Sequence, residues 1–387
     1  MAKMRVLSPA EAALVRRIRR AAASFRRANQ LTKAPWEASS YPLATNIDGQ
    51  PDVKTLVWYP GPGCAWSEAG GCLMCNFGWS STEGGPSAIE LFVDHLRQLD
   101  RGTRHLHLGP GGSFYDDRET SPAMRQEVLH VLSELRALRT LGIETRPNLV
   151  TYDLLMDTVE QLPHSVTRLV LGFGLECWND FLREIAVNKG YSRQSVVKAG
   201  EIVAKANANQ RRVDIEFETY ILLKPVLLTE REAVDEALRT VDWSLRVGAG
   251  SCAIFMNTIK DATVQGFLAQ RDDLRSPLRY QTAYLRSAVE VLHRLPSSAR
   301  RRTVVLGLQS GIMATEGPRG CERCAPFLLG AIYAHSFDRA EHVIRRAASS
   351  WCPCRDAWEQ EMTHVELTTL QERARALIRT LEEGGFV

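Results

Sequence analysis

The sequence predicts an α/β protein built on a partial (β/α)6 TIM-like barrel, and two observations predict it. Apolar segments rich in β-branched residues alternate with amphipathic segments from residue 53 to about residue 300. Strands that alternate with helices in this way form a parallel sheet, and six such units suit a partial barrel better than a small doubly wound sheet. The composition, 44% hydrophobic and 24% charged over 387 residues, is that of a globular protein and argues against a disordered chain.

Local signals predict the individual elements. The predicted strands are 53–59, 104–108, 143–145, 167–173, 213–223 and 252–257, with one more at 303–308. The predicted helices are 8–29, 89–100, 122–141, 152–161, 195–208 and 230–241. Ser121 before Pro122 indicates a capped helix start, and Thr229 with Glu232 has the spacing of a capping box.

We expect three parts: a basic helical N-terminal extension (1–50), the barrel (51–300) and a small C-terminal metal-binding module (301–387). The first 35 residues contain one acid, Glu11, and nine basic residues, which are Lys3, Arg5, Arg16, Arg17, Arg19, Arg20, Arg26, Arg27 and Lys33. A basic helix can hold the phosphates of RNA or of a nucleotide. The alternative is a solvated helix that lies across the barrel, since runs of charge usually face water.

Hydropathy and the cysteine content indicate in which cellular compartment the protein is expected. The sequence has no apolar run of about 18 residues, so we expect no transmembrane helix. The N-terminal residues lack the apolar stretch of a secretory signal. We therefore expect a cytoplasmic protein, whose nine cysteines are metal ligands or catalytic groups rather than disulfides.

Three cysteines follow the first predicted strand. Cys64, Cys72 and Cys75 have the spacing C-x7-C-x2-C in a glycine-rich loop. Glycines let such a loop curl so that three sulfurs converge on a metal. Three thiolates on a four-iron cluster leave one iron open for a ligand. Zinc is the alternative, but a structural zinc site takes four ligands, and this loop offers no fourth Cys or His.

This loop resembles that of the radical S-adenosylmethionine (SAM) superfamily, although its first gap is wider than the common C-x3-C-x2-C. The wide gap resembles the branch of the Elongator catalytic subunit and, more closely, the archaeosine-biosynthesis radical SAM proteins. Further matching segments follow in order: GPGGSFYDDR (109–118), IETRPNLVT (143–151), GFGLE (172–176), VNKG (187–190) and YILLKPVLLTE (220–230). The resemblance covers about residues 50–290. It implies that Cys64, Cys72 and Cys75 hold a 4Fe-4S cluster that cleaves SAM to a 5′-deoxyadenosyl radical.

The same resemblance implies which residues bind SAM; they are Met74, Gly111, Gly112, Ser113, Glu144, Arg146 and Glu176. Met74 is implied to pack near the adenine, and the glycine stretch to accept the amino group. Arg146 is implied to hold the carboxylate and Glu144 a ribose or amino group. The alternative for these charged residues is an ionic bridge across the barrel mouth. Lys189 and Lys224 are candidates for the substrate side, or are simply solvated.

A second cysteine cluster lies in the C-terminal module: Cys321 and Cys324, then Cys352 and Cys354. Two close pairs supply the four ligands of a closed metal site, either zinc or an auxiliary Fe–S cluster. The need for a second iron site in many enzymes of this superfamily favours the cluster, and a disulfide pair is the remaining alternative. A histidine could replace one thiol, and the candidates are His335, His342 and His364. Cys177 and Cys252 are expected to be buried as small apolar side chains.

The functional hypothesis is a radical SAM enzyme that abstracts hydrogen from a nucleoside or nucleotide-like small molecule in a biosynthetic pathway. The auxiliary cluster would assist with sulfur insertion or redox chemistry, and flavodoxin or ferredoxin would donate electrons. The alternative is an enzyme of the archaeosine type that modifies a base in tRNA. A net charge of +3 is modest for an RNA-binding enzyme. The alternative from another functional class is a scaffold protein that binds a cluster or zinc without catalysing a reaction.

Overall fold

The computed structural model describes residues 6–29, 38–47, 49–58, 62–77, 86–109, 111–308 and 314–386. Lys3, Arg5, Lys33, Tyr59 and Pro110, which the sequence analysis named, lie outside these residues. The strands are β1 (Ser39–Ile47), β2 (Gln50–Trp58), β3 (His105–Gly109), β4 (Thr140–Glu144), β5 (Arg168–Glu176), β6 (Asp214–Leu223), β7 (Ser251–Met256), β8 (Ile259–Lys260), β9 (Thr303–Leu306) and β10 (Ala314–Glu316).

The α-helices are α1 (Pro9–Ala28), α2 (Pro86–Arg97), α3 (Pro122–Val131), α4 (Tyr152–Gln161), α5 (Asp180–Leu182), α6 (Arg193–Asn209), α7 (Glu230–Arg246), α8 (Val264–Ala269), α9 (Leu285–Arg294), α10 (Ser297–Arg301), α11 (Ala325–Asp338), α12 (Glu341–Ser349), α13 (Pro353–Thr363) and α14 (Leu370–Glu383). Short 3-10 helices are η1 (Ala65–Ala69), η3 (Leu132–Glu134) and η4 (Pro147–Leu149), and η5 (Arg183–Val187) is a π-helix.

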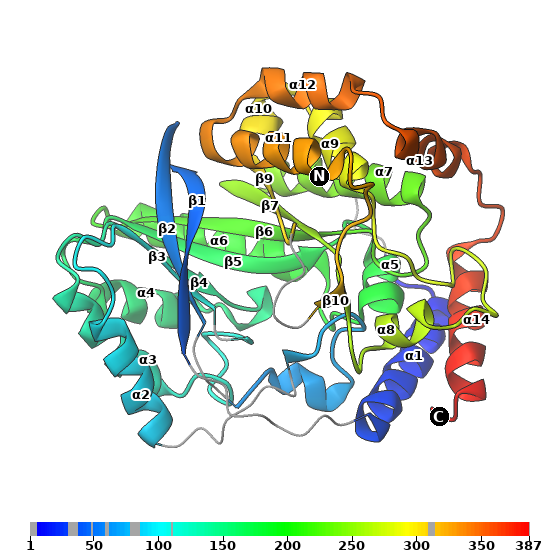
Figure 1. Ribbon diagram of the computed structural model, residues 1–387. Coiled ribbons are helices and arrows are strands. Elements are labelled where there is room, and N and C mark those ends of the chain that lie inside the picture. Colours follow the sequence, from blue (N-terminus) through cyan, green and yellow to red (C-terminus); the bar gives the residue numbers. More distant parts are fainter. Residues whose placement is uncertain are drawn as a thin grey trace.

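One eight-stranded sheet organises the fold. Its order is β1-β2-β3-β4-β5-β6-β7-β9, with β1 antiparallel to β2 and every later neighbour parallel. The sheet curls into a half-barrel with helices on its outer side (Figure 1). This arrangement confirms the predicted α/β half-barrel. Because the strands from β2 onward are parallel, their carboxyl ends meet at one mouth, where barrel active sites form.

The seven predicted strands correspond to β2, β3, β4, β5, β6, β7 and β9. Strand β1 was not predicted, because Pro42 and its polar neighbours do not resemble a strand. The sheet includes β1 and β9, so it extends past residues 51–300 at both ends. The predicted helix 122–141 is wrong in its second half, since α3 ends at Val131. The chain must become extended by Thr140, which pairs with His105 in β3.

The basic helix α1 is amphipathic rather than solvated on all sides. Ser8 caps it in a capping box with Glu11. Its apolar side chains are buried, and the helix contacts α14, η1 and η5. Figure 1 shows α1 and α14 side by side, so the first and the last helix of the described chain pack together, and α1 also contacts the cysteine loop at η1.

The C-terminal segment packs onto the barrel. Helix α11 contacts β9 at one edge of the sheet and β1 and β2 at the other. Leu328, Ile332 and Ile344 belong to the same apolar cluster as Ile221 and Ile254 of the sheet. The C-terminal segment is thus anchored on the sheet by shared apolar burial. In the described part of the chain, no helix is both long and apolar enough to cross a membrane.

Candidate active site

The first cysteine cluster lies at the barrel mouth, just after β2. Tight turns fold its loop: Ser67 N–H donates to Cys64 O (2.9 Å) and Cys75 N–H to Cys72 O (3.1 Å). Burial, together with the charges of Glu119, Cys75 and Cys72, raises the pKa of the Cys64 thiol to about 12. The three thiols are therefore near enough to influence one another, and a metal that bound them would displace their protons.

Residues from the far side of the barrel hold this loop in place. The Asn188 side chain donates to Gly71 O (2.7 Å), and its main-chain oxygen accepts from Trp66 Nε1 (2.7 Å). Leu73 N–H donates to Val187 O at 2.9 Å. Asn188 ends η5 with φ +58°, a left-handed conformation that asparagine tolerates better than most residues. The sequence VNKG thus serves to support the cysteine loop.

The glycine stretch after β3 lies against the same loop. A Cβ atom on Gly112 would be 3.5 Å from Cys64 Cα and would overlap the Glu119 carboxylate. Ser113 is buried, and its hydroxyl lies 2.7 Å from Thr145 Oγ1 and accepts from Arg146 N–H (3.1 Å). The Ser113 side chain therefore joins the ends of β3 and β4 and does not point freely to a ligand.

Glu119 is a site residue that sequence reasoning missed. Its carboxylate accepts from Ala65 N–H at 2.7 Å and, by a short bond, from Ser113 N–H. A carboxylate from six residues further on thus reaches the glycine stretch. Burial raises the pKa of Glu119 to about 7. Its place among three acids in the segment DDRE gave no local signal of this contact.

Arg146 forms no ion pair among the described residues. Its guanidinium carbon lies 4.9 Å from the centroid of the Trp66 ring and 5.2 Å from that of Tyr191. Its nearest polar contacts are long, to Asn148 Oδ1 (3.5 Å) and Lys189 O (3.4 Å). Arg146 therefore does not form the ionic bridge across the barrel mouth that the sequence analysis gave as the alternative. The guanidinium lies within cation–π distance of both rings at the mouth, with donors left for a carboxylate.

Glu176 and Lys189 do form an ion pair, with Glu176 Oε1 2.7 Å from Lys189 Nζ. Both side chains are largely buried, and Glu176 has φ +68°. Burial raises the pKa of Cys72 to about 11, and the positive charge of Lys189 opposes this rise. Lys224 is likewise buried, and its Nζ lies 2.6 Å from Glu230 Oε2. Neither lysine is solvated.

Glu144 points into the barrel rather than toward Arg146. Its Oε1 lies 3.3 Å from His107 Nε2, and Tyr220 OH lies 3.1 Å from the same nitrogen. Glycines make room for these side chains, because a Cβ on Gly142 would overlap the His107 ring and one on Gly172 the Tyr220 hydroxyl. Glu144 and Tyr220 remain partly exposed. The barrel interior is thus polar, where barrels of this kind usually contain branched apolar residues.

Met74 also lies in the loop, and its main-chain oxygen accepts a long hydrogen bond (3.5 Å) from Lys260 Nζ. Lys260 ends β8 and is largely buried, and burial lowers its pKa. Sequence reasoning missed this lysine, because the segment Thr258–Lys260 shows no motif. It brings a further cation to the cysteine loop.

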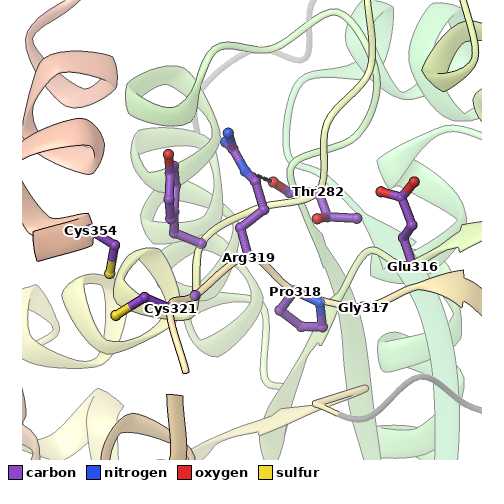
Figure 2. Close-up of a pocket in the computed structure, with 9 residues that line it drawn as sticks. Thr282, Glu316, Gly317, Pro318, Arg319, Cys321 and Cys354 are labelled. Atoms are coloured by element: carbon purple, nitrogen blue, oxygen red, sulfur yellow. Dashed lines mark hydrogen bonds between the residues drawn. The ribbon is translucent and has the colours of Figure 1, made fainter. Parts of the chain in front are cut away.

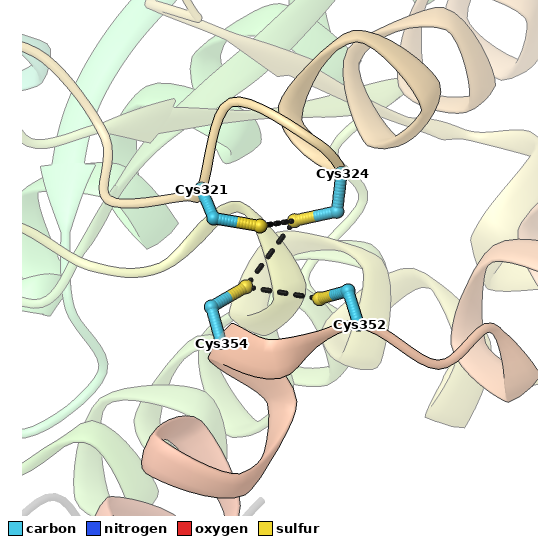
Figure 3. Close-up of side chains that lie close together, drawn as sticks. All are labelled: Cys321, Cys324, Cys352 and Cys354. Atoms are coloured by element: carbon cyan, nitrogen blue, oxygen red, sulfur yellow. Dashed lines mark hydrogen bonds between the residues drawn. The ribbon is translucent and has the colours of Figure 1, made fainter.

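The four C-terminal cysteines come together (Figure 3). Their sulfurs all lie within 4.8 Å of one another, with Cys324 Sγ 3.2 Å from Cys354 Sγ. Arg286 Nη2 donates to Cys352 Sγ at 3.0 Å. Burial opposes ionisation of Cys352, but hydrogen bonds from Cys354 and Arg286 outweigh it and lower the pKa to about 6. The group can hold a metal centre.

Two kinds of centre fit these four ligands. Zinc–sulfur bonds of about 2.3 Å place tetrahedral sulfurs about 3.8 Å apart, close to the observed separations. The group could also hold an auxiliary Fe–S cluster, with the two chain segments further apart so that each thiolate has its own iron. Among the described residues, the four C-terminal cysteines are the only group of three or more His, Cys, Asp or Glu side chains whose ligand atoms lie close enough together to bind one metal ion. Cys64, Cys72 and Cys75 do not form such a group.

A pocket of about 510 Å³ lies beside this group, and Cys321, Cys354, Tyr284 and Arg319 are among its lining residues (Figure 2). Arg319 is fully engaged: its guanidinium donates twice to Glu361 (2.8 Å each) and once to Glu230 (3.2 Å). The network joins the segment before the cysteines to α7 and α13. It fixes the C-terminal segment on the mouth side of the barrel.

The remaining candidates have structural surroundings. His335 is buried with Nε2 3.2 Å from Arg300 O, whereas His342 is exposed and His364 lies 3.7 Å from Glu366. None of these histidines belongs to the cysteine group. Cys177 and Cys252 are buried, as predicted.

The described residues fit a cluster with SAM in three respects. Cys64, Cys72 and Cys75 lie in one loop, near enough that the charges of the other two thiols raise the pKa of Cys64. The loop has cations of Lys189 and Lys260 nearby. The unpaired Arg146 lies at the same mouth. These are the ligands and the counter-charges that a cluster and a SAM carboxylate need.

Comparison with known proteins adds the decisive observation. No protein-family profile matches the chain. The archaeosine synthase subunit beta of Methanosarcina acetivorans is 26% identical over 333 residues, which are 84% of this chain and 89% of that protein. The protein of the same name from Thermococcus kodakarensis is 27% identical over 325 residues, 81% of this chain and 93% of that protein. This is the branch that the cysteine loop resembles. The two relatives and the cysteine loop together support a member of the radical SAM superfamily.

Solved structures of radical SAM enzymes show a weaker likeness to this chain. The methyltransferase TsrM from Kitasatospora setae, with cobalamin and a [4Fe-4S] cluster bound, has 13% identity and a TM-score of 0.43. The alignment covers 79% of this chain and 61% of that one. Coproporphyrinogen III oxidase (HemN) from Escherichia coli has 14% identity and a TM-score of 0.34, and 55% of it is covered. The chain thus spans less than two thirds of either structure.

Proposed function

We propose that this radical SAM protein binds a 4Fe-4S cluster through Cys64, Cys72 and Cys75 and abstracts hydrogen from a nucleoside or nucleotide-like substrate. The observation that carries the proposal is that Cys64, Cys72 and Cys75 lie near one another in one loop at the barrel mouth, close to Arg146, which forms no ion pair among the described residues. When bound, the cluster and SAM supply a 5′-deoxyadenosyl radical. The chain's own residues position SAM, shape the substrate chamber and limit access of water.

Arg146 is the residue that holds the SAM carboxylate in this proposal. Its ring contacts with Trp66 and Tyr191 fix the plane of the guanidinium, so two parallel hydrogen bonds to a carboxylate cost little ordering. Met74 in the cysteine loop would contact the adenine, and the glycine stretch Gly111–Ser113, which lies against Cys64, would contact the amino group. Glu176 with Lys189 would stay an ion pair that sets the charge next to Cys72.

The barrel interior supports a heterocyclic substrate. Hydrogen-bond donors and acceptors are offered there by the neighbouring side chains of His107, Glu144 and Tyr220. Burial and the carboxylates of Glu144 and Glu218 raise the pKa of Tyr220, so its hydroxyl stays protonated and can donate. Trp58 lies at the same mouth with its ring centroid 5.2 Å from that of Phe77. Hydrogen-bonding edges next to aromatic faces are what a nucleobase requires.

A second candidate substrate is a base within tRNA. The relatives named archaeosine synthase subunit beta favour it, because they align over more than four fifths of their length. Arg16, Arg20 and Arg27 of α1 are exposed, so this helix offers cations to phosphates as well as an apolar face to the core. Flavodoxin or ferredoxin is the proposed electron donor for either substrate. The C-terminal metal centre is proposed to assist by redox chemistry or sulfur donation.

Anaerobic reconstitution followed by deuterium transfer tests these proposals. Reduced protein is incubated with SAM and with deuterated candidate nucleosides, nucleotides or tRNA. Deuterium recovered in 5′-deoxyadenosine from a free nucleoside supports the first candidate, and transfer only from tRNA supports the second. Absence of 5′-deoxyadenosine from a protein loaded with about four barrel irons would contradict the proposed function.

A further inference from the structure

We propose that Arg26, on the basic N-terminal helix, is a positioning residue that raises the reduction potential of the barrel cluster. The proposal rests on the cluster proposed above for Cys64, Cys72 and Cys75. Arg26 Nη2 donates to the main-chain oxygen of Cys75 at 2.8 Å and to that of Cys72 at 3.4 Å. One guanidinium therefore binds the backbone of two of the three proposed ligands.

The loop is shaped to admit this arginine. A Cβ atom on Gly71 would lie 2.5 Å from Arg26 Nη2, and Gly71 has φ +59°, where glycine is favoured. A Cβ on Gly70 would lie 2.9 Å from Arg19 O, on the backbone of α1 itself. The two glycines before Cys72 thus let the helix approach the loop closely. A larger residue at Gly70 would meet the backbone of α1, and one at Gly71 would displace the Arg26 guanidinium.

The rest of α1 fixes the arginine in register with the loop. Ile18, Ala22 and Phe25 are buried against the barrel and α14. Two turns earlier, Arg19 Nη2 donates to Glu184 Oε2 at 3.0 Å, and its guanidinium lies 5.1 Å from the Trp66 ring centroid. The helix is held by apolar contacts and by this second arginine. Arg26 does not have to anchor the helix alone.

The electrostatic consequence follows from the charge change on reduction. One electron from a low-potential donor makes the cluster and its thiolates more negative by one charge. A fixed cation beside two ligands stabilises the reduced state more than the oxidised state, so it raises the potential. Its hydrogen bonds also draw electron density from the peptide groups of Cys72 and Cys75. A positive charge at this place makes the cluster easier to reduce.

The test is a potentiometric titration of the full-length protein, monitored by the part of the reduced EPR spectrum that changes when SAM is added. That criterion selects the barrel cluster even if the C-terminal cysteines also hold iron. We expect Arg26→Gln to keep about four barrel irons and to lower the reduction equilibrium constant about tenfold, a fall of about 59 mV for a one-electron couple. Arg27→Gln removes the same charge from the exposed side of α1 and should leave the potential unchanged.

Arg26→Lys covers the case in which Arg26→Gln fails to retain iron. Lysine keeps the cation and one hydrogen bond, so iron and a potential near the wild-type value support the proposal. An unchanged potential in a fully loaded Arg26→Gln protein overturns it, and so do equal shifts in Arg26→Gln and Arg27→Gln. Loss of iron in both Arg26 variants also overturns it, since the shape of arginine would then matter rather than its charge. Wild-type protein without a SAM-sensitive cluster would contradict the proposed function instead.

Discussion

Glu119 Oε1 accepts a hydrogen bond from Ala65 N–H at 2.7 Å, directly after Cys64, while its other oxygen accepts from Ser113 N–H. One buried carboxylate thus joins the cysteine loop to the glycine stretch, which are proposed to hold the cluster and SAM respectively. The two parts of the site are therefore fixed relative to each other by a side chain that belongs to neither motif.

Glu119→Ala should loosen this junction. Two N–H groups lose their acceptor, which costs about 1–3 kcal/mol for each group left buried and unpaired. We expect lower iron retention on desalting and a lower unfolding midpoint in urea. Glu127→Ala, at an exposed site of α3, is the matched control and should change neither. Full iron retention in Glu119→Ala would show that the loop holds its shape without this carboxylate.

The triple variant Cys64→Ala, Cys72→Ala and Cys75→Ala tests the proposed cluster. We expect it to lose about four irons per chain and all release of 5′-deoxyadenosine, because these thiolates supply every protein ligand of the cluster. Cys252→Ala, which removes a buried cysteine of β7, should keep the iron. Iron analysis and chromatographic detection of 5′-deoxyadenosine measure the two effects. Continued SAM cleavage by the triple variant would contradict the assignment of the loop.

Arg146→Lys tests the proposed SAM contact. Lysine cannot lie flat between Trp66 and Tyr191 and cannot make paired hydrogen bonds to a carboxylate. We expect SAM affinity to fall by about 1–3 kcal/mol with unchanged iron content, which equilibrium binding to reconstituted protein measures. Arg136→Lys, at an exposed position, is the control. Unchanged SAM affinity in Arg146→Lys would assign this arginine a structural role.

The double variant Cys321→Ser and Cys354→Ser tests the C-terminal centre. We expect it to lose the second metal and keep the barrel irons, because the four sulfurs form a group separate from the barrel cysteines. Metal analysis of reconstituted wild type then identifies the centre. About four further irons would support the auxiliary cluster favoured by the sequence, whereas one zinc would support the single-ion geometry of the sulfurs. Retention of both metals by the double variant would contradict the assignment.

The sequence was sufficient wherever a local signal determines structure. The capping box at Thr229, the parallel strands and the C-terminal cysteine group follow from residue types a few positions apart. Strand β1 escaped prediction although Asp48-Gly49 is a hairpin signal, because its residues are half-exposed and polar. The end of α3 was missed because pairing of Thr140 with β3, rather than helix propensity, decides it.

The missed site residues depend on tertiary position. His107 and Tyr220 point inward because of strand parity and register, and they meet because Gly142 and Gly172 lie between them. Arg26 reaches the cysteine loop through the packing of α1, which its charge pattern did not disclose. A single sequence contains no spacing that relates such residues across 50 or more positions. Only the folded chain shows which of its many arginines and glutamates lie at the site.

Asp180 tests the support beneath the cysteine loop and gives a pH dependence. It pairs with Arg183, whose side chain is fully buried at the start of η5, and its Oδ2 lies 3.1 Å from Arg193 Nε. Burial opposes ionisation, but the charges of the two arginines outweigh it and hold the pKa of Asp180 below its usual value. The π-helix η5 leads to Asn188, whose side chain donates to Gly71 O in the cysteine loop. The ion pair of Asp180 with Arg183 therefore helps to hold that loop in place.

Asp180→Asn leaves the Arg183 charge buried without a counter-charge, so we expect a loss of about 3–5 kcal/mol in unfolding free energy at pH 7. A carboxylate whose pKa is lower in the folded state contributes stability above its unfolded pKa of about 3.9 and loses it as pH falls through the folded value. The difference between wild type and variant should therefore be largest at neutral pH and narrow below about pH 4. Urea unfolding of metal-free protein from pH 7 downward measures this difference. A gap that stays constant over the whole range would mean that packing, and not the charge of Asp180, stabilises η5.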